Sequence, residues 1–273
     1  MLKNHQFHHK HHIHLRPELQ DTVLLIKRLL LLIILMKIKI LGTRGEIKAS
    51  LPEHANHSGV LIDSVILLDV GEKKFLDYYP KYIFTTHLHP DHAYFVRRGI
   101  VEATEVVDFT IFAPEGYKDF ANVKVLSGET ILDSYKITPV PTHHSKLVQS
   151  QSYIIEKDGE KLLYTGDVVL IDKKYYPLFN GLDLVITDGS YIRKGGLILK
   201  DKTTGRIYGH TGIPNLIDMY KEYTQDILFI HFGGWFFENP QKSIKQLEEL
   251  GSENGVNVIA GYDGMEIDLQ HLP

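Results

Sequence analysis

Residues 83–95, with the sequence IFTTHLHPDHAYF, combine several side chains that bind metal ions at short spacing. The segment contains three imidazoles and one carboxylate within six positions: His87, His89, Asp91 and His92. Pro90 restricts the backbone there, and the apolar run before the segment is typical of a strand that ends in a loop. Ligands of these types at this spacing predict a site for two cations that prefer nitrogen and oxygen. The alternative is a solvated turn that is rich in histidine.

Three further apolar runs end abruptly in residues that bind metal. His143 and His144 lie near the end of the segment YKITPVPTHHS, Asp167 near the end of KLLYTGDV, and His231 within DILFIHFGG. Core packing does not account for this repetition, so we expect these side chains to complete a two-metal site. Two divalent cations about 3.5–4 Å apart lower the pKa of a shared water toward about 7 and stabilise developing negative charge. The chemistry that this favours is hydrolysis.

The elements that must position these ligands are mostly short β-type runs after Met36. Helical patterns are fewer; they cover residues 213–224 and 239–251, with Pro240 near the start of the second and Gly251 at its end. No long linker rich in Pro, Ser or Gly divides the chain. We expect one α/β domain over residues 36–273, in which sheets pack together and helices lie outside.

Composition narrows the function classes. The formal net charge of -4 argues against broad nucleic-acid binding driven by net charge. The chain has no cysteine, which excludes disulfides, thiolate metal sites and cysteine nucleophiles. Any metal must therefore be held by imidazole, carboxylate and water. A cytoplasmic location is compatible with this composition and is the one we expect.

Residues 1–35 differ from the rest of the chain. Residues 5–14 hold six of the 16 histidines, and an apolar tract leads from there to Met36. Its longest uninterrupted run, residues 29–36, has eight residues, whereas a transmembrane helix needs about 20. No cleavage site of small residues, as in a secretory signal, follows it. We expect Met36 to be the biological start, residues 1–35 to be an unstructured upstream extension, and no membrane partner.

The order of these motifs resembles the metallo-β-lactamase-fold hydrolase superfamily. Its motif is His-x-His-x-Asp-His, followed by a His, an Asp and a His at successive strand ends. The resemblance covers nearly all of residues 36–263, and MKIKILGTRGEI and HSGVLIDSVILLDVGE look like the opening strands and Asp-x-Gly loop of the phosphodiesterase branch. It implies a four-layer αββα sandwich. It also implies two divalent metal ions, with Zn expected and Mn or Fe as alternatives.

Carried over position by position, the resemblance assigns the ligands. It implies one metal on His87, His89 and His144, a second on Asp91, His92 and His231, and Asp167 as the bridge. His143 competes with His144 for the first set. The resemblance favours His144, because HSKL followed by a strand looks like the family's third motif, and His143 would then support the ligands from behind. Asp69 and Asp188, also at strand ends, are expected to hydrogen-bond to ligand histidines.

The segment GHTGI contains His210 and resembles the Gly-His-Ser/Thr motif of ribonuclease Z-like phosphodiesterases, in which this His acts on the leaving group. Histidine suits this role because its pKa lies in the neutral range. The resemblance therefore implies a phosphodiesterase that uses metal-bound hydroxide, with Asp91 and His210 in the catalytic set. The alternative is that His210 only caps the helix at 213 or hydrogen-bonds to Asp167.

Residues near His210 and His231 suggest the substrate. Residues 191–210 are rich in Lys and Arg, which usually face solvent. Because this segment precedes His210, we expect Arg206 to contact a phosphate of the substrate. Trp235 is expected to stack on a base or ring, although Trp235 and its neighbours Phe236 and Phe237 also suit a core.

Only 22 residues separate His144 from Asp167, which leaves no room for the tRNA-binding arm of transfer-RNA processing members. A small nucleotide-like or cyclic phosphodiester is therefore the expected substrate. The alternatives are a thioesterase or lactonase on the same metal site, and a metal-dependent binding protein without catalysis. A homodimer is compatible with the sequence.

Overall fold

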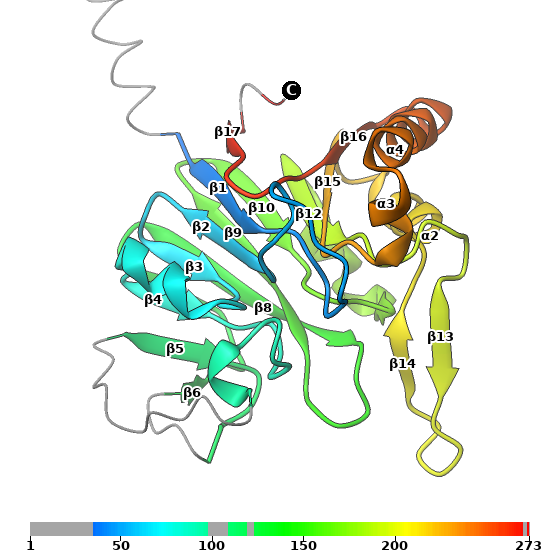
Figure 1. Ribbon diagram of the computed structural model, residues 1–273. Coiled ribbons are helices and arrows are strands. Elements are labelled where there is room, and N and C mark those ends of the chain that lie inside the picture. Colours follow the sequence, from blue (N-terminus) through cyan, green and yellow to red (C-terminus); the bar gives the residue numbers. More distant parts are fainter. Residues whose placement is uncertain (1–34, 98–108, 119–122, 270–271, 273) are drawn as a thin grey trace, which may run out of the picture. The chain divides into compact units, whose positions relative to one another are not determined.

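Two large β-sheets dominate the part of the chain that the computed structural model describes, residues 35–97, 109–118, 123–269 and 272 (Figure 1). The prediction for residues 1–35 falls outside these ranges, apart from Leu35. Residues 36–273 form one compact unit. No helix in the described ranges has the length and apolar character that crossing a bilayer requires.

The first sheet has seven strands, and β17 brings the end of the chain back to pair with β1. Strands β3 to β6 run parallel, while β17, β1, β2 and β3 pair antiparallel. In spatial order the strands are β17 (Glu266–Asp268), β1 (Lys37–Gly42), β2 (Gly59–Ile62), β3 (Ile66–Leu68), β4 (Tyr82–Phe84), β5 (Thr110–Ala113) and β6 (Val123–Val125).

The second sheet has eight strands and contains a parallel ladder of β10, β12, β15 and β16. β7 (Thr130–Leu132) pairs with β8, off the main path. The path itself runs β11 (Leu170–Ile171), β8 (Tyr135–His143), β9 (Gln151–Lys157), β10 (Glu160–Tyr164), β12 (Leu184–Asp188), β15 (Asp226–Ile230) and β16 (Asn257–Ala260).

Alternation along the strands builds a core on each face of the sheets. In β10, Leu162 and Tyr164 join the cluster between the two sheets, whereas Leu163 points to the outer face. The outer cluster packs β12 and β15 against α2 (Ile213–Tyr220), α3 (Gly234–Glu238) and α4 (Pro240–Asn254). The helices of this layer lie together on one side of the second sheet in Figure 1.

The outer face of the first sheet packs against short 3-10 helices, η1 (Lys73–Tyr78) and η2 (Tyr94–Val96). The second sheet carries a further one, η3 (Lys173–Phe179), in its outer cluster. The order of layers is therefore helices, sheet, sheet, helices, and the expected αββα sandwich of the α/β class is confirmed.

The helix predicted over 239–251 continues beyond Gly251 and ends at Asn254. Gly255 is the residue that terminates it, because its φ of 70° lies in the left-handed region. Gly251 has a packing role instead. A Cβ there would lie 2.8 Å from the Val256 carbonyl oxygen and 3.0 Å from the Val258 side chain, so only glycine lets the helix approach β16 this closely.

A separate two-stranded hairpin consists of β13 (Leu197–Lys200) and β14 (Ile207–His210). It projects beyond the two sheets in Figure 1, below α2. Asp201 closes its turn by accepting hydrogen bonds from the backbone N–H groups of Thr203 and Thr204. Because β14 ends at His210, one end of the hairpin lies at the predicted site.

Candidate active site

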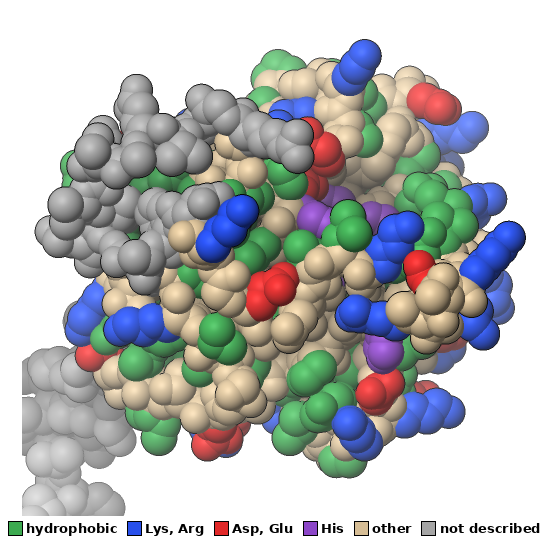
Figure 2. All heavy atoms as spheres, turned by 90° about the horizontal axis from the view of Figure 1, so that it is seen from below, with side chains coloured by type: hydrophobic (Ala, Val, Ile, Leu, Met, Phe, Trp, Pro, Cys, Tyr) green, Lys and Arg blue, Asp and Glu red, His purple; other side chains and the backbone are tan. Residues whose placement is uncertain are grey.

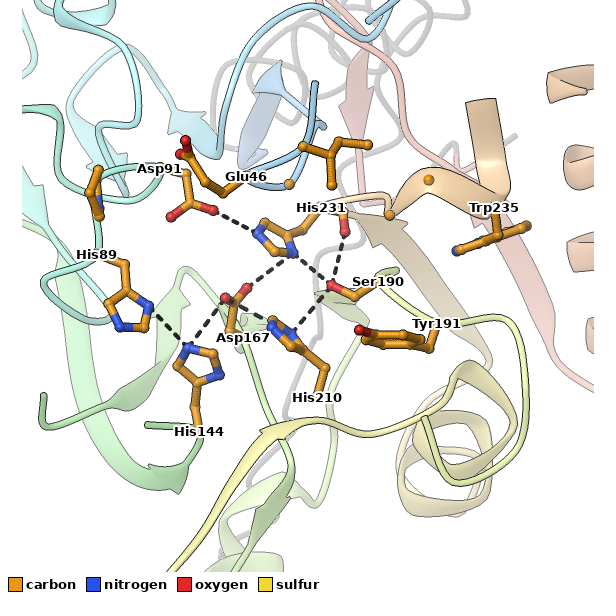
Figure 3. Close-up of a pocket in the computed structure, with 15 residues that line it drawn as sticks. Glu46, His89, Asp91, His144, Asp167, Ser190, Tyr191, His210, His231 and Trp235 are labelled. Atoms are coloured by element: carbon orange, nitrogen blue, oxygen red, sulfur yellow. Dashed lines mark hydrogen bonds and ion pairs between the residues drawn. The ribbon is translucent and has the colours of Figure 1, made fainter. Parts of the chain in front are cut away.

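Strand ends from both sheets meet where the predicted ligands lie. The parallel strands β10, β12 and β15 finish at the same edge of the second sheet and lead directly to Asp167, Asp188 and His231. β8 ends at His143, next to His144, and residues 87–92 follow β4 of the first sheet. Residues far apart in the sequence are thereby brought to one place, as Figure 3 shows.

One cluster contains His87, His89, His144 and Asp167, whose ligand atoms all lie within 4.8 Å of one another. The Nδ1 atom of His89 lies 3.0 Å from Nε2 of His87 and 3.2 Å from Nε2 of His144. Asp167 contributes Oδ2, which lies 3.5 Å from Nε2 of His144. Three ring nitrogens and one carboxylate oxygen thus converge, which is a donor set that suits zinc.

A second cluster contains Asp91, His92 and His231, also within 4.8 Å of one another. The Nε2 atom of His231 lies 3.0 Å from Oδ2 of Asp91, and Nε2 of His92 lies 3.8 Å from the same oxygen. Asp167 reaches this cluster with its other oxygen, because Oδ1 lies 3.2 Å from Nε2 of His92. The two oxygens of Asp167 therefore face different clusters, as expected of a bridging ligand.

Two buried polar atoms in these clusters have no hydrogen-bond partner among the described residues. They are Nε2 of His92 and Oδ1 of Asp167. An unsatisfied buried polar atom costs about 1–3 kcal/mol, so native proteins usually provide a partner for it. A cation at the second cluster would satisfy both atoms, because both face it, and the donor set of the first cluster suits another. The residues present therefore fit two divalent metal ions.

The protonation states of the first cluster suit metal binding. Burial lowers the pKa of His87 well below its ordinary value, and burial also lowers the pKa of His144 to about 4. Both rings are therefore neutral at pH 7, which is the form that binds a metal. Burial alone would raise the pKa of Asp167, but the imidazoles of His231 and His92 outweigh it and hold that pKa well below the usual range.

Asp69 supports the second cluster through a contact with His92. Its carboxylate lies 2.7 Å from Nδ1 of His92 and accepts hydrogen bonds from the Thr86 backbone N–H at 2.6 Å and from the Tyr164 hydroxyl at 2.8 Å. The bond to Nδ1 turns Nε2 of His92 toward Asp91 and Asp167. The structure thus places Asp69 where the sequence analysis expected it.

Asp188 is placed against two histidines. Its Oδ2 atom lies 2.7 Å from Nδ1 of His210, and its Oδ1 atom lies 3.5 Å from Nδ1 of His231. Burial disfavours the charged form of His210, but the carboxylates of Asp188 and Asp167 outweigh it and raise the pKa of His210 above its ordinary value. Because Nδ1 is bonded to Asp188, Nε2 is the ring nitrogen of His210 that remains for a ligand.

Ser190 is a site residue that the sequence analysis missed. Its Oγ atom lies 2.9 Å from Nδ1 of His231 and 3.3 Å from Nδ1 of His210, so one hydroxyl contacts both rings. Its backbone N–H donates to Asp188 at 2.9 Å. The motif TDGS, in which Ser190 follows the predicted Asp188 by two positions, was the available signal.

A cavity of about 440 Å³ opens above the clusters. Beyond the ligands and His210, its walls are formed by Glu46, Ile47, Ser190, Tyr191 and Trp235. None of the described residues that line it is a Lys or Arg. Figure 3 shows Glu46 on one side of His231 and both aromatic rings on the other. Glu46 and Tyr191 were not predicted from the sequence as site residues.

Other predicted residues lie elsewhere. Trp235 lines the cavity and donates its indole N–H to the Gly189 carbonyl at 2.9 Å, whereas Phe236 is buried in the outer core. Arg206 is exposed in the hairpin turn and does not line the cavity. His54 is buried away from the cavity lining, and its ring packs edge-on against the ring of Phe236.

The expectation that His143 supports the ligands is not met. Its side chain is 40% exposed, and its Nε2 atom lies 3.1 Å from Asp172 at the surface. Successive side chains at the end of a strand point to opposite sides, so a His144 that faces the cluster directs His143 outward. The alternation of side chains along β8 thus agrees with the choice of His144, rather than His143, as the residue that faces the cluster.

Comparisons with known proteins agree with this fold. Residues 79–232 match the family model described as the beta-lactamase superfamily domain. The metallo-beta-lactamase fold protein YhfI from Bacillus subtilis superposes with a TM-score of 0.58 and 17% identity, covering 86% of this chain and 99% of its own. The comparison with curated proteins gave no match.

Two further solved structures share the fold. One is described as a new diphosphatase from the PhnP family, with a TM-score of 0.59, 15% identity, and coverage of 85% of this chain and 96% of its own. The other is the human tRNase Z short form, ELAC1, with a TM-score of 0.55, 16% identity, and coverage of 85% and 99%. At these identities the likeness demonstrates a common fold.

Proposed function

The chain belongs to the beta-lactamase superfamily, and we propose that it is a metal-dependent hydrolase that uses two divalent cations to cleave a phosphodiester. The observation that carries the proposal is Asp167, whose two oxygens face two separate groups of ligands, while Nε2 of His92 and its own Oδ1 remain unsatisfied. Zn is the cation we expect, with Mn or Fe as alternatives, because imidazole and carboxylate ligands accept all three.

The ligand assignment follows the clusters. His87, His89 and His144 would hold one cation, Asp91, His92 and His231 the other, and Asp167 both. Two such cations lower the pKa of water toward about 7 and polarise the scissile group, which supplies the hydrolytic chemistry.

The chain's own residues supply the proton for the leaving group. Asp188 holds Nδ1 of His210 at 2.7 Å and favours the protonated ring, so that Nε2 presents a proton to the cavity. A phosphodiester needs this proton, because an alkoxide is a poor leaving group. Ser190 fixes the orientation of the same ring. This pairing favours a phosphodiester over a thioester, whose thiolate leaving group has less need of a proton.

The two neighbours described as a diphosphatase and a tRNase support the proposal by analogy only. The cavity of about 440 Å³ suits a small substrate rather than a folded RNA. Trp235 and Tyr191 form the wall against which a non-reacting ring would pack. A cytoplasmic location and a homodimer remain predictions, which fractionation and light scattering would test.

The test is hydrolysis of bis(p-nitrophenyl) phosphate by purified protein loaded with Zn or Mn, beside Asp91→Ala and His210→Ala. We expect turnover to vanish in Asp91→Ala together with part of the bound metal. In His210→Ala, kcat should fall by about 10²–10⁴-fold for a diester with an alkoxide leaving group, such as a cyclic nucleotide, with the metal content unchanged. The fall should be much smaller for bis(p-nitrophenyl) phosphate, because p-nitrophenolate leaves without needing a proton. Protein that binds two metals per chain and does not hydrolyse the ester would contradict the phosphodiesterase assignment and favour a thioester or lactone.

A further inference from the structure

One face of the β13–β14 hairpin continues directly from the proposed active site. Leu197 lies opposite His210 in the ladder, and Leu199 lies opposite Tyr208. Paired residues of antiparallel strands share a face, as do alternate residues along one strand. Leu197, Leu199 and Tyr208 therefore share a face with His210, and we call these three residues the apolar strip.

The strip is unusual because its aliphatic side chains face solvent. Leu197 is 40% exposed and Leu199 is 43% exposed. Ile198, which points to the opposite face, is 45% exposed, so each face of β13 leaves part of its apolar surface open to solvent. Contiguous exposed aliphatic residues beside an active site mark a surface for an apolar ligand or partner.

The strip is tied to the site through the backbone. Gly209 of β14 donates its N–H to the His144 carbonyl at 2.7 Å, and its carbonyl lies 2.9 Å from Nδ1 of His144. The loop after His144 forms the neighbouring border. Lys146 places Nζ 5.2 Å from the Tyr208 ring centroid, and Leu147 is 80% exposed.

Figure 2 views this side of the molecule from the end of the hairpin. Histidine side chains lie in a hollow, and hydrophobic, Lys and Arg side chains gather beside it. A ligand held at the clusters thus has an apolar path along the hairpin. The two residue steps from Leu197 to Leu199 correspond to a path of about 7 Å along β13.

The chemistry of the strip distinguishes between occupants. A polyanion would need several cations along its path. Lys146 lies beside Tyr208, but Lys202 and Arg206 belong to the turn beyond the strip, and the described residues that line the cavity include no Lys or Arg. Bases of a single strand stack on successive aromatic rings, whereas the strip has one such ring, Tyr208, beside the aliphatic Leu197 and Leu199. A hydrocarbon chain matches the strip without these conflicts.

We propose that the apolar strip binds the hydrocarbon chain of an amphiphilic phosphodiester whose phosphate lies at the His/Asp clusters. This inference rests on the proposed phosphodiesterase function and names its substrate class. The chain would lie along Leu197 and Leu199, leaving the cavity between His210 and the loop that carries Lys146.

The test uses p-nitrophenyl alkyl phosphates with methyl, butyl, octyl and dodecyl chains, kept below their micelle-forming concentrations. We expect kcat/KM to rise by about twofold per methylene, since partial burial of a CH₂ contributes somewhat less than full transfer from water. The increase should stop near the octyl ester, once the chain exceeds the strip. A kcat/KM that does not depend on chain length would overturn the proposal.

Leu199→Asn and Ile198→Asn form a matched pair, because both residues are exposed to a similar extent on the same strand but on opposite faces. Leu199→Asn should lower kcat/KM for the octyl ester by about tenfold and leave the methyl ester unchanged. Ile198→Asn should change neither. Equal losses in both variants, or a wild-type dimer that Leu199→Asn converts to monomer in light scattering, would overturn the chain-binding role.

A binding measurement separates this inference from the proposed function. Calorimetry with octyl phosphonate and methyl phosphonate on the metal-loaded protein does not depend on turnover. Tighter binding of the octyl compound that is lost in Leu199→Asn supports the strip even when no ester is hydrolysed. Turnover of the methyl ester with equal binding of both phosphonates would reject the strip and leave the phosphodiesterase in place.

Discussion

The floor and the rim of the site are built in opposite ways. The floor consists of the ligand clusters, whose side chains are largely buried and contact one another or a supporting group such as Asp69 and Asp188. The rim includes the β13–β14 hairpin, in which every residue of β13 is exposed. The floor is thus fixed by packing before any substrate arrives, whereas the rim has surface left to bind one.

This difference separates reactivity from selectivity. Floor residues follow the ends of strands that belong to two packed sheets, so displacing one ligand would disturb the core behind it. Rim residues extend from the domain on a hairpin whose own contacts contribute little stability. Substitutions on the rim can therefore alter which ester binds while the chemistry at the floor is retained, and the effects of mutation should decrease from floor to rim.

The largest effect is expected at Asp167, the residue shared between the clusters. Asp167→Asn removes the charge that faces both ligand groups and leaves an amide that binds cations poorly. We expect bound metal to fall below two per chain after dialysis, as measured by plasma emission. Phosphodiester turnover should fall by at least about a thousandfold, which corresponds to about 4 kcal/mol of lost transition-state stabilisation.

Asp172→Asn is the matched control, because that carboxylate contacts His143 at the surface, away from the clusters. It should retain two metals and full turnover. If Asp167→Asn kept both metals and most of its activity, the shared-ligand geometry would not be the basis of the floor.

The floor could largely be predicted from the sequence, because its ligands lie at strand ends with fixed spacing. His87, His89, Asp91, His92 and Asp167 each follow an apolar run, and the structure brings them together. The preference for His144 over His143 came from the family resemblance alone, since the residues themselves do not show which face of β8 is turned inward. Gly251 shows the same limit, because a glycine that ends a helix and one that lets it pack closely look alike in sequence.

The rim could not be predicted in the same way. Arg206 looked like a phosphate contact because it precedes His210 in the sequence, but the turn of the hairpin carries it away from the cavity. Glu46 and Tyr191 line the cavity through loops whose paths depend on tertiary contacts. Glu46, for example, is held by a two-pronged ion pair with Arg97, 51 residues away.

An intermediate effect is expected at Asp69, which supports the floor without belonging to a metal cluster. Asp69 has a φ of 56°, a conformation that asparagine also tolerates, so Asp69→Asn should keep the backbone. The amide cannot accept all the hydrogen bonds that reach the carboxylate from Thr86, His92 and Tyr164. We expect metal affinity to fall by about 10–100-fold in a competition titration with a chromogenic chelator.

Asp63→Asn provides the comparison for that measurement. Asp63 also has a positive φ, of 51°, and accepts hydrogen bonds from Tyr135 and Lys157, but it lies at the β2–β3 turn. Its substitution should affect stability alone, seen as a lower melting temperature with unchanged metal affinity. Equal loss of metal affinity in both variants would mean that general destabilisation, rather than orientation of His92, explains the effect of Asp69→Asn.

The smallest effect is expected at Arg206, on the outermost part of the rim. Its side chain is exposed in the hairpin turn, beyond the residues that line the cavity, and an exposed cation at this position interacts weakly with a phosphate at physiological salt. Arg206→Ala should therefore change kcat/KM for bis(p-nitrophenyl) phosphate by less than about twofold at about 0.15 M salt. A tenfold rise in KM that disappears at high salt would show instead that the turn folds over the bound ester. The boundary between floor and rim would then have to be drawn outside the hairpin, because even its tip would share in holding the substrate.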